Sequence, residues 1–237
     1  MYMYHGYYGP VSFDWTYILL ILSTLLSVFA SIMVKGNYSK YSAVRAKRGL
    51  TAEAAAQAVL HANGVYDVSI GRVSGNLTDN YNPKTKVISL SDSVYGSHSV
   101  AAIGVACHEA GHAVQYAKEY APAKLRLAMV PAVNFGSRFS MIILLIGFAL
   151  GFMGLIWTGI ILFSASTAFH LVTLPTELDA SRRALDALKT QGIMDKTELK
   201  GAKKVLTSAA LTYVAALASS LIVLLRYIMM ANNRRRD

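Results

Sequence analysis

The longest apolar stretch of the chain constrains the fold more than any other feature. Residues 127–174 contain a single charged side chain, Arg138. At about 1.5 Å per residue, one straight helix of this length would reach about 70 Å, more than twice the ~30 Å hydrocarbon core of a bilayer. The stretch must therefore fold back on itself, and four glycines mark its middle: Gly147, Gly151, Gly154 and Gly159. We predict a transmembrane hairpin of two helices, at about 128–150 and 154–174.

Two further apolar runs are long enough to cross a bilayer. Thr16 to Val34 carries no charge, and residues 1–15 before it contain no Lys or Arg, so the run resembles an uncleaved anchor rather than a secretory signal. Residues 205–231 form the fourth candidate. Only 15% of the chain is charged, against about 25% in ordinary globular domains. The chain is therefore predicted to be a mainly α integral membrane protein with about four transmembrane helices.

The formal net charge of +10 does not indicate nucleic acid, because the basic residues cluster beside apolar runs and no nucleic-acid motif is present. Basic segments favour the cytoplasm, which places residues 35–126 and 175–204 inside and the N-terminus outside. The terminal cluster Arg234–Arg236 would then lie outside, against the same rule. We expect a multi-pass protein of the plasma membrane, with the lipid bilayer as a partner.

Residues 35–98 have the pattern of a soluble segment. Thr51 can cap a short helix over 51–64 and Gly64 can end it. Strand signals follow, and the pair Asn82–Pro83 turns the chain between two strand-like runs. The second run, Lys86–Ser91, could be an exposed edge that binds an extended peptide, or an ordinary internal strand.

The next helix, which Ser97 or Ser99 can cap, carries the motif His-Glu-Ala-Gly-His. Residues four apart lie one above the other on a helix, so His108 and His112 present two ring nitrogens to one point. Glu109 can reach a water at that point without binding the metal. Zn²⁺ with three protein ligands keeps a fourth position for water and lowers the pKa of that water to about 7. The motif thus predicts one Zn²⁺ per chain on His108, His112 and a third ligand, with Glu109 as the catalytic base.

The third ligand must come from elsewhere. Position 118 is Lys118, so a third histidine six residues after His112 is excluded, and Glu119 would lie about 10 Å further along the helix axis. The segment 173–188 remains, and we expect it to start a helix at Pro175. It places Glu177 in one stripe with small residues: Ala180 or Ser181, and Ala184.

Such a stripe would let the segment pack closely against the small-residue motif helix, which favours Glu177 as the ligand. Asp179 points about 200° away from Glu177 and is explained as a carboxylate near a helix start. Asp179 and His170 remain the alternatives. Glu177 also satisfies topology, because the two spans of the hairpin return it to the membrane face of His112.

Three segments together carry a family resemblance: VACHEAGHAVQYA, LTDNYNPKTKVISLSDSVY before it, and LPTELDASRRAL after it. They resemble the bacterial membrane-embedded neutral zinc metallopeptidases, the YugP-like group, over about 35–190. The resemblance implies zinc on His108, His112 and Glu177, and Glu109 as base. The Glu-x-x-Ala-x-x-x-Ala pattern is also distantly similar to membrane gluzincins, which have aspartate where this chain has Ser181.

We therefore expect five segments, which include a small α+β zincin-like catalytic domain. They are an N-terminal tail with the first transmembrane helix (1–34), the metalloprotease-like domain (35–126), the transmembrane hairpin (127–174), the third-ligand helix with a polar segment (175–204), and the last transmembrane helix with its basic tail (205–237).

The leading hypothesis is a membrane-bound zinc metalloendopeptidase that cuts membrane proteins or peptides at the cytoplasmic face. A membrane-protein partner or a second copy of the chain would fit such a role. A non-catalytic scaffold with a structural zinc is the alternative. Proteolysis within the bilayer is disfavoured, because it would bury two histidines and a glutamate at membrane depth.

Two further expectations concern single residues. A peptidase needs a group that stabilises the oxyanion, for which His98, His170 and the tyrosines are candidates. Cys107, the only cysteine, is expected to be a packing residue.

Overall fold

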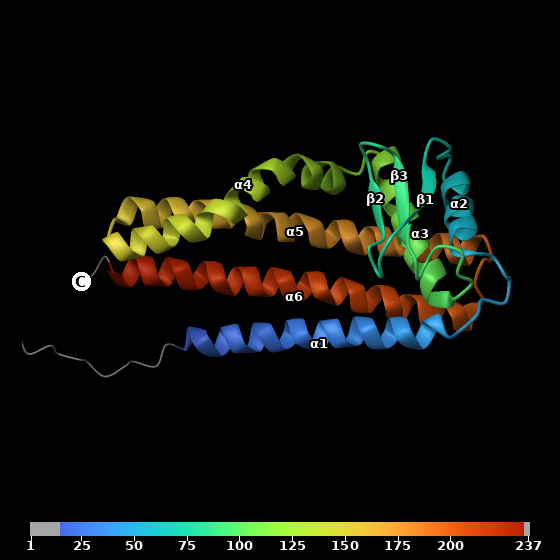
Figure 1. The fold of residues 1–237 in the computed structure, drawn as a ribbon, viewed down its shortest axis with the longest axis horizontal. Helices are drawn as coiled ribbons and strands as arrows, with labels where there is room; N and C mark the ends of the chain where they lie inside the picture. The colour runs from blue at the N-terminus through green and yellow to red at the C-terminus, as the bar shows by residue number, and fades with distance from the viewer. Residues whose placement is uncertain (1–14, 235–237) are drawn as a thin grey trace, which may run out of the picture.

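The computed structural model describes residues 15–234, so the Tyr-rich N-terminus and the last two arginines of the terminal cluster lie outside the described residues. Six helices and three strands follow one another in these residues (Figure 1): α1 Thr16–Ser42, α2 Ala52–Ala62, β1 Ser69–Val73, β2 Asn80–Asn82, β3 Val87–Ser91, α3 Val100–Ala117, α4 Ala121–Leu150, α5 Met153–Thr190 and α6 Lys196–Arg234.

Four helices, α1, α4, α5 and α6, are long and apolar enough to cross a membrane, which confirms the predicted fold class. They lie side by side, and the sheet, α2 and α3 gather at one end of the bundle (Figure 1). The start of α1, the end of α6 and the turn between α4 and α5 lie at the opposite end. The four crossings thus return both described chain ends to one side, as expected.

The predicted hairpin is formed by α4 and α5. Gly151 ends α4 in the left-handed conformation, at φ +68°, which glycine adopts without strain. Gly147 and Gly159 let the two helices approach closely. A Cβ added to Gly147 would lie 2.8 Å from the Ile156 nitrogen, and one added to Gly159 would lie 2.6 Å from Leu144 Cγ. Small residues of this kind let two helices pack closely. Close packing matters in a membrane because the hydrophobic effect does not drive helices together there.

We call α2, the three strands and α3 the small domain. Capping residues and a turn in the sequence determine where its elements begin and end. Thr51 and Ser99 cap α2 and α3, each accepting a bond from the backbone N–H three residues on. β2 and β3 form an antiparallel hairpin around the predicted turn, and β1 pairs in parallel with β3. The strand order β1-β3-β2 makes β3 the central strand. Lys86–Ser91 is therefore an internal strand, and the idea that it binds substrate through a free edge is wrong.

Two helix boundaries also differ from expectation. Pro175 does not begin a helix but lies inside α5, and α6 continues through the polar residues 196–204 into its apolar part. A proline within a helix removes one backbone hydrogen bond, whereas a break would leave several backbone groups unpaired at a helix end. The residue expected to supply the third ligand is consequently carried by the same rigid helix that crosses the membrane.

The small domain and the bundle approach closely between α3 and α5. A Cβ built on Gly111 would meet the Ala180 carbonyl oxygen at 2.5 Å, so only glycine fits. Gly111 and Ala180 are both buried, and the core continues through Ala110 and Ala184. This confirms the expected approach of two small-residue faces.

Replacement of Gly111 by Ala should force α3 and α5 apart and destabilise the fold by about 1–3 kcal/mol, the usual cost of overpacking. Thermal unfolding in detergent would measure the change. Gly104→Ala is the matched control on the same helix, because its Cβ would meet Ala202 Cβ at 3.4 Å, an ordinary contact, and alanine favours a helix. Equal unfolding temperatures for the two variants would contradict the assignment of this contact.

Candidate metal centre

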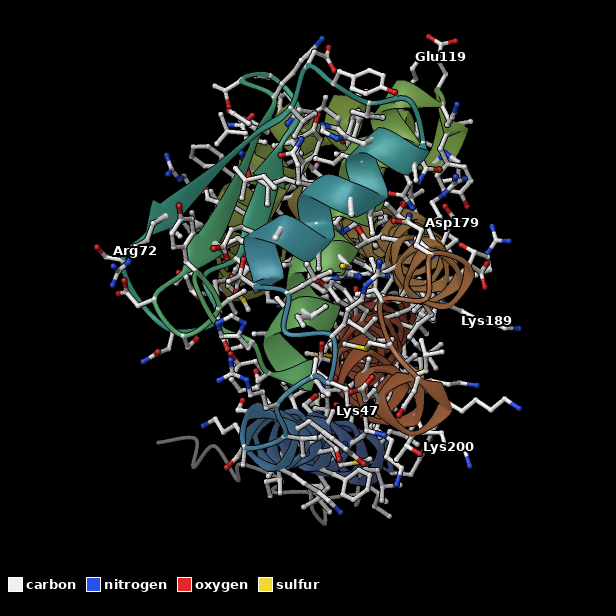
Figure 2. The ribbon with its side chains drawn as sticks, turned by 90° about the vertical axis from the view of Figure 1, so that its right-hand side faces the viewer. Lys47, Arg72, Glu119, Asp179, Lys189 and Lys200 are labelled. Atoms are coloured by element: carbon white, nitrogen blue, oxygen red, sulfur yellow. The ribbon has the colours of Figure 1, made fainter. Side chains whose placement is uncertain are left out.

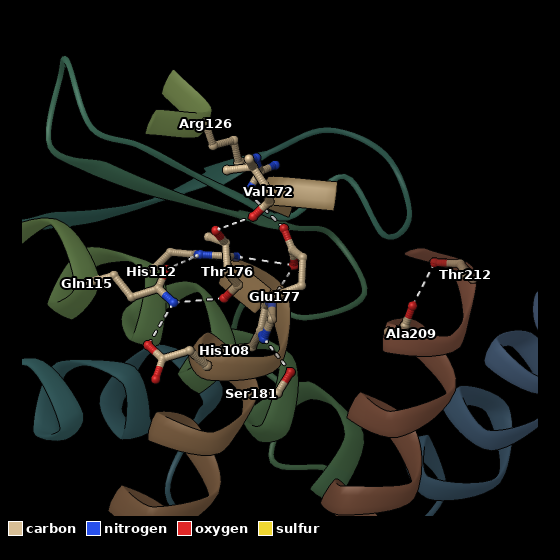
Figure 3. Close-up of polar contacts among 11 residues, drawn as sticks. His108, His112, Gln115, Arg126, Val172, Thr176, Glu177, Ser181, Ala209 and Thr212 are labelled. Atoms are coloured by element: carbon tan, nitrogen blue, oxygen red, sulfur yellow. Dashed lines mark hydrogen bonds and ion pairs between the residues drawn. The ribbon is translucent and has the colours of Figure 1, made fainter. Parts of the chain in front are cut away.

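Three side chains from two helices meet at the junction of the bundle and the small domain. His108 and His112 come from α3 and Glu177 from α5, and each offers one ligand atom, all within 4.8 Å of one another. Glu177 Oε2 lies 3.2 Å from His108 Nε2 and 3.4 Å from His112 Nε2. Figure 3 shows the two imidazoles and the carboxylate pointing toward one another. Two imidazole nitrogens and a carboxylate oxygen form a donor set that suits Zn²⁺.

The other ring nitrogen of each histidine, Nδ1, forms a hydrogen bond with a neighbouring side chain. His108 Nδ1 lies 3.0 Å from the Ser181 hydroxyl, and His112 Nδ1 lies 3.0 Å from Gln115 Oε1. Such bonds fix the orientation of an imidazole and leave Nε2 free to bind a metal. Ser181, one turn after Glu177 on α5, thus supplies a hydroxyl to the imidazole of His108.

Gln115 connects the site to α5. Its amide nitrogen donates to the Thr176 carbonyl at 2.7 Å and to Asp179 Oδ2 at 2.9 Å. Asp179 also pairs with Arg183 at 2.6 Å and with Arg182. Asp179 therefore lies outside the three donors, as expected, but our explanation by a helix start is wrong because Asp179 is in the interior of α5.

Arg126 is a contributor that sequence reasoning missed. From α4 its Nη1 donates to Glu177 Oε1 at 2.8 Å (Figure 3), and the Glu177 side chain is only 4% exposed. A buried carboxylate needs such partners to remain charged. The guanidinium holds one oxygen of Glu177 and leaves the other facing the histidines. Position along the sequence gives no sign of this role, because Arg126 precedes Glu177 by an entire transmembrane hairpin.

Glu109 is buried next to the donors. Burial raises the pKa of its carboxyl, although the neighbouring charges of His108 and His112 act in the opposite direction. For His112, burial acts to lower the pKa, but the hydrogen bond that its imidazole donates to Glu177 and the charge of Glu109 outweigh burial, and the pKa is raised. Within residues 15–234, the Glu109 carboxylate forms no hydrogen bond or ion pair. Glu109 therefore has capacity to bind a water or a substrate group.

Two cavities border the Glu109 carboxylate. A polar cleft of about 270 Å³ is lined by Tyr81 of β2, Arg126 of α4 and Tyr213 of α6, together with the three donors. A largely apolar pocket of about 200 Å³ also borders Glu109 and is lined by Val34, Val205 and other residues, most of them from α1, α3, α5 and α6. The site is thus open to molecules from the cleft and has an apolar recess beside it.

Other sequence candidates lie away from the donors. His98 contacts the Gly49 carbonyl at 3.0 Å near the start of α3. His170 lines a separate cavity between α4 and α5. Of the tyrosines, Tyr81, Tyr116 and Tyr213 line the polar cleft. Cys107 is fully buried, and burial raises the pKa of its thiol, which agrees with a packing role.

Comparison with known protein sequences gives the family of this chain. Residues 16–232 match the sequence model of a family described as "Putative neutral zinc metallopeptidase". The chain belongs to this family. It is 45% identical to "Putative membrane protease YugP" of Bacillus subtilis (strain 168) over 222 residues, which cover 93% of this chain and 99% of the relative. No solved structure matches the chain significantly.

Family membership and geometry together establish a membrane protein of a zinc peptidase family with a His-His-Glu candidate metal centre. The match extends beyond the range of about 35–190 that carried the resemblance, into α1 and α6. The family match therefore includes α1 and α6 as well as α3, which carries the His-Glu-Ala-Gly-His motif.

Removing the Ser181 hydroxyl tests whether its hydrogen bond to His108 helps the site to bind zinc. Ser181→Ala should weaken zinc affinity by about 10- to 100-fold, the usual effect of losing a bond behind a metal-binding histidine. Competition with a chromophoric chelator would measure it. Ser208→Ala is the control, because Ser208 is also buried but within residues 15–234 its hydroxyl donates only to the Val205 carbonyl of its own helix. A loss of affinity shared by both variants would argue against the role of Ser181.

Proposed function

We propose that the protein is a membrane-bound zinc metalloendopeptidase that hydrolyses peptide bonds of membrane proteins or peptides. One Zn²⁺ per chain is held by His108, His112 and Glu177, in a gluzincin-like arrangement. The observation that carries the proposal is the convergence of these three donors next to the buried Glu109, whose carboxylate forms no hydrogen bond or ion pair within residues 15–234. Bound zinc supplies a Lewis acid that polarises a carbonyl and acidifies a water.

The side chains of this protein do the remaining work. Glu109 accepts the proton of the attacking water and delivers it to the leaving amine. Arg126 holds Glu177 and so keeps its second oxygen directed at the histidines. Ser181 and Gln115 keep the imidazoles oriented. Tyr213 and Arg126 line the cleft where the oxyanion of the substrate would develop.

The shape of the cleft supports a peptide substrate. Within residues 15–234 β2 pairs only with β3 and is an edge strand of the sheet, and Asn80 and Tyr81 of this strand line the polar cleft. An extended peptide can add to such an edge through main-chain hydrogen bonds. The proposal therefore moves the substrate strand from the expected 86–91 run to β2.

The site faces the cytoplasm in this proposal. The two basic segments 35–126 and 175–204 lie at the sheet end of the bundle (Figure 1), and cationic segments favour the cytoplasmic side. Arg234 belongs to the opposing terminal cluster, but it donates to the Phe148 carbonyl at 2.5 Å and so has a structural role at the hairpin turn. The catalytic helix α3 is not among the four candidate spans, which argues against chemistry at membrane depth.

The metal ligands can be tested directly. Glu177→Gln should reduce bound zinc from one per chain to a small fraction, because the charged donor is lost. Asp179→Asn should retain most of the zinc, because Asp179 contacts Gln115 and two arginines rather than the donor atoms. Metal analysis after equilibration with a chelator gives the measurement. If Asp179→Asn lost the metal and Glu177→Gln kept it, the ligand assignment would be wrong.

The base is tested by Glu109→Gln. This variant should keep its zinc, because Glu109 is not a ligand, and should lose peptidase activity by about 10²- to 10⁴-fold. Cleavage of a panel of membrane proteins and peptides in detergent, followed by mass spectrometry, measures the rate. If neither the native protein nor the variant cleaved any member of the panel while both bound zinc, the non-catalytic scaffold would be the better explanation.

A further inference from the structure

A groove of about 610 Å³ runs between α5 and α6 on the outside of the helix pair. It takes no part in the proposed reaction. Four leucines form its floor, and we call it the α5–α6 groove: Leu178, Leu185, Leu199 and Leu206. Leu178 is 49% exposed, although it lies directly after the buried Glu177. A floor of this kind favours an apolar occupant.

The rim of the α5–α6 groove is cationic. Five basic side chains line it and one acidic side chain, Asp186, accompanies them: Arg182, Lys189, Lys196, Lys200 and Lys203. Within residues 15–234 the four lysines form no ion pair, and only Arg182 is paired, with Asp179. Figure 2 shows Lys189 and Lys200 projecting from the two helices on the same side, away from Arg72 on the sheet. The rim thus presents uncompensated positive charge.

The α5–α6 groove begins where the apolar spans end. The apolar part of α5 ends at about Leu174 and that of α6 begins at about Val205. Leu178 and Leu206 therefore lie next to the hydrocarbon boundary, and Arg182 and Lys203 lie about one turn farther out, at the level of lipid headgroups. A molecule with an apolar tail and an anionic head can place the tail on Leu178 and Leu206 and the head beside Arg182 and Lys203.

We propose that the α5–α6 groove is a binding site for an anionic phospholipid. An acyl chain lies over Leu178 and Leu206, and the phosphate faces Arg182, Lys200 and Lys203. Basic pockets between transmembrane helices on the cytoplasmic side recognise anionic headgroups in this way. A zwitterionic lipid offers the same tail without the net charge that the rim requires.

The inner wall of the α5–α6 groove is shared with the metal centre. Ser181, Leu206 and Ala210 line both the groove and the apolar pocket beside the donors. Ser181 bonds to His108 at 3.0 Å. A lipid in the groove therefore packs against the back of the helix turn that carries the third donor, and it restrains the spacing of α5 and α6 there.

Native mass spectrometry of the full chain in detergent tests the site. Dioleoyl phosphatidylglycerol should remain bound, whereas dioleoyl phosphatidylcholine should be lost at the same concentration. Lys200→Gln/Lys203→Gln should reduce retained phosphatidylglycerol by at least about tenfold, since each juxtamembrane lysine contributes to the attraction of anionic lipid. Both lysines are exposed, so unfolding temperatures without lipid should not change.

Lys35→Gln/Lys204→Gln is the matched control. It removes the same charge from exposed juxtamembrane positions on α1 and α6 that do not line the groove, and it should retain phosphatidylglycerol. An equal loss in both double variants would show only a general attraction of surface charge and would overturn the site. Equal retention of phosphatidylcholine, or equally tight binding of glycerol phosphate without acyl chains, would overturn it as well.

Discussion

The contact between Gly111 and Ala180 is the constraint on which the site depends. Two histidines on one helix define only a direction, and a third donor must approach within hydrogen-bonding distance of both. Side chains larger than those of Gly111 and Ala180 would keep the axes of α3 and α5 too far apart for Glu177 to reach the imidazoles. The absence of a Cβ at Gly111 lets the backbone of α5 come against α3, and the carboxylate one turn away then lies between the histidines and Arg126.

The membrane supplies the second condition. Glu177 and Arg126 flank the transmembrane hairpin, so the site closes only when α4 and α5 turn back after crossing. The glycines at the turn and along the helix contact allow this return. Because α5 continues unbroken through Pro175 to Glu177, the position of the donor is fixed by the packing of the whole span. The geometry of the candidate metal centre is therefore a property of the membrane bundle as much as of the small domain.

Periodicity and chain length were sufficient to predict the four spans, the hairpin and the place of the motif helix, because each reflects a local requirement of helix or bilayer. The meeting of Glu177 with His108 and His112 also followed, since spacing excluded Glu119 and the stripe of small residues favoured Glu177. Arg126 and Gln115 could not be predicted, because their roles arise from contacts across elements that no local pattern encodes. The Pro175 boundary was wrong for a related reason: the propensity of one residue was outweighed by the backbone bonding of a long helix.

The surroundings of Glu109 separate a catalytic from a structural reading of the site. A structural zinc site is closed by four protein ligands, whereas three donors converge here. The Glu109 side chain is largely buried and forms no hydrogen bond or ion pair within residues 15–234. This arrangement costs free energy, and an apolar residue would be more favourable in a protein that needed only a structural metal. Glu109 instead lines both the polar cleft and the apolar pocket, so molecules that enter these cavities can reach it. The unfavourable burial is explained if the carboxylate acts on molecules that enter the cleft.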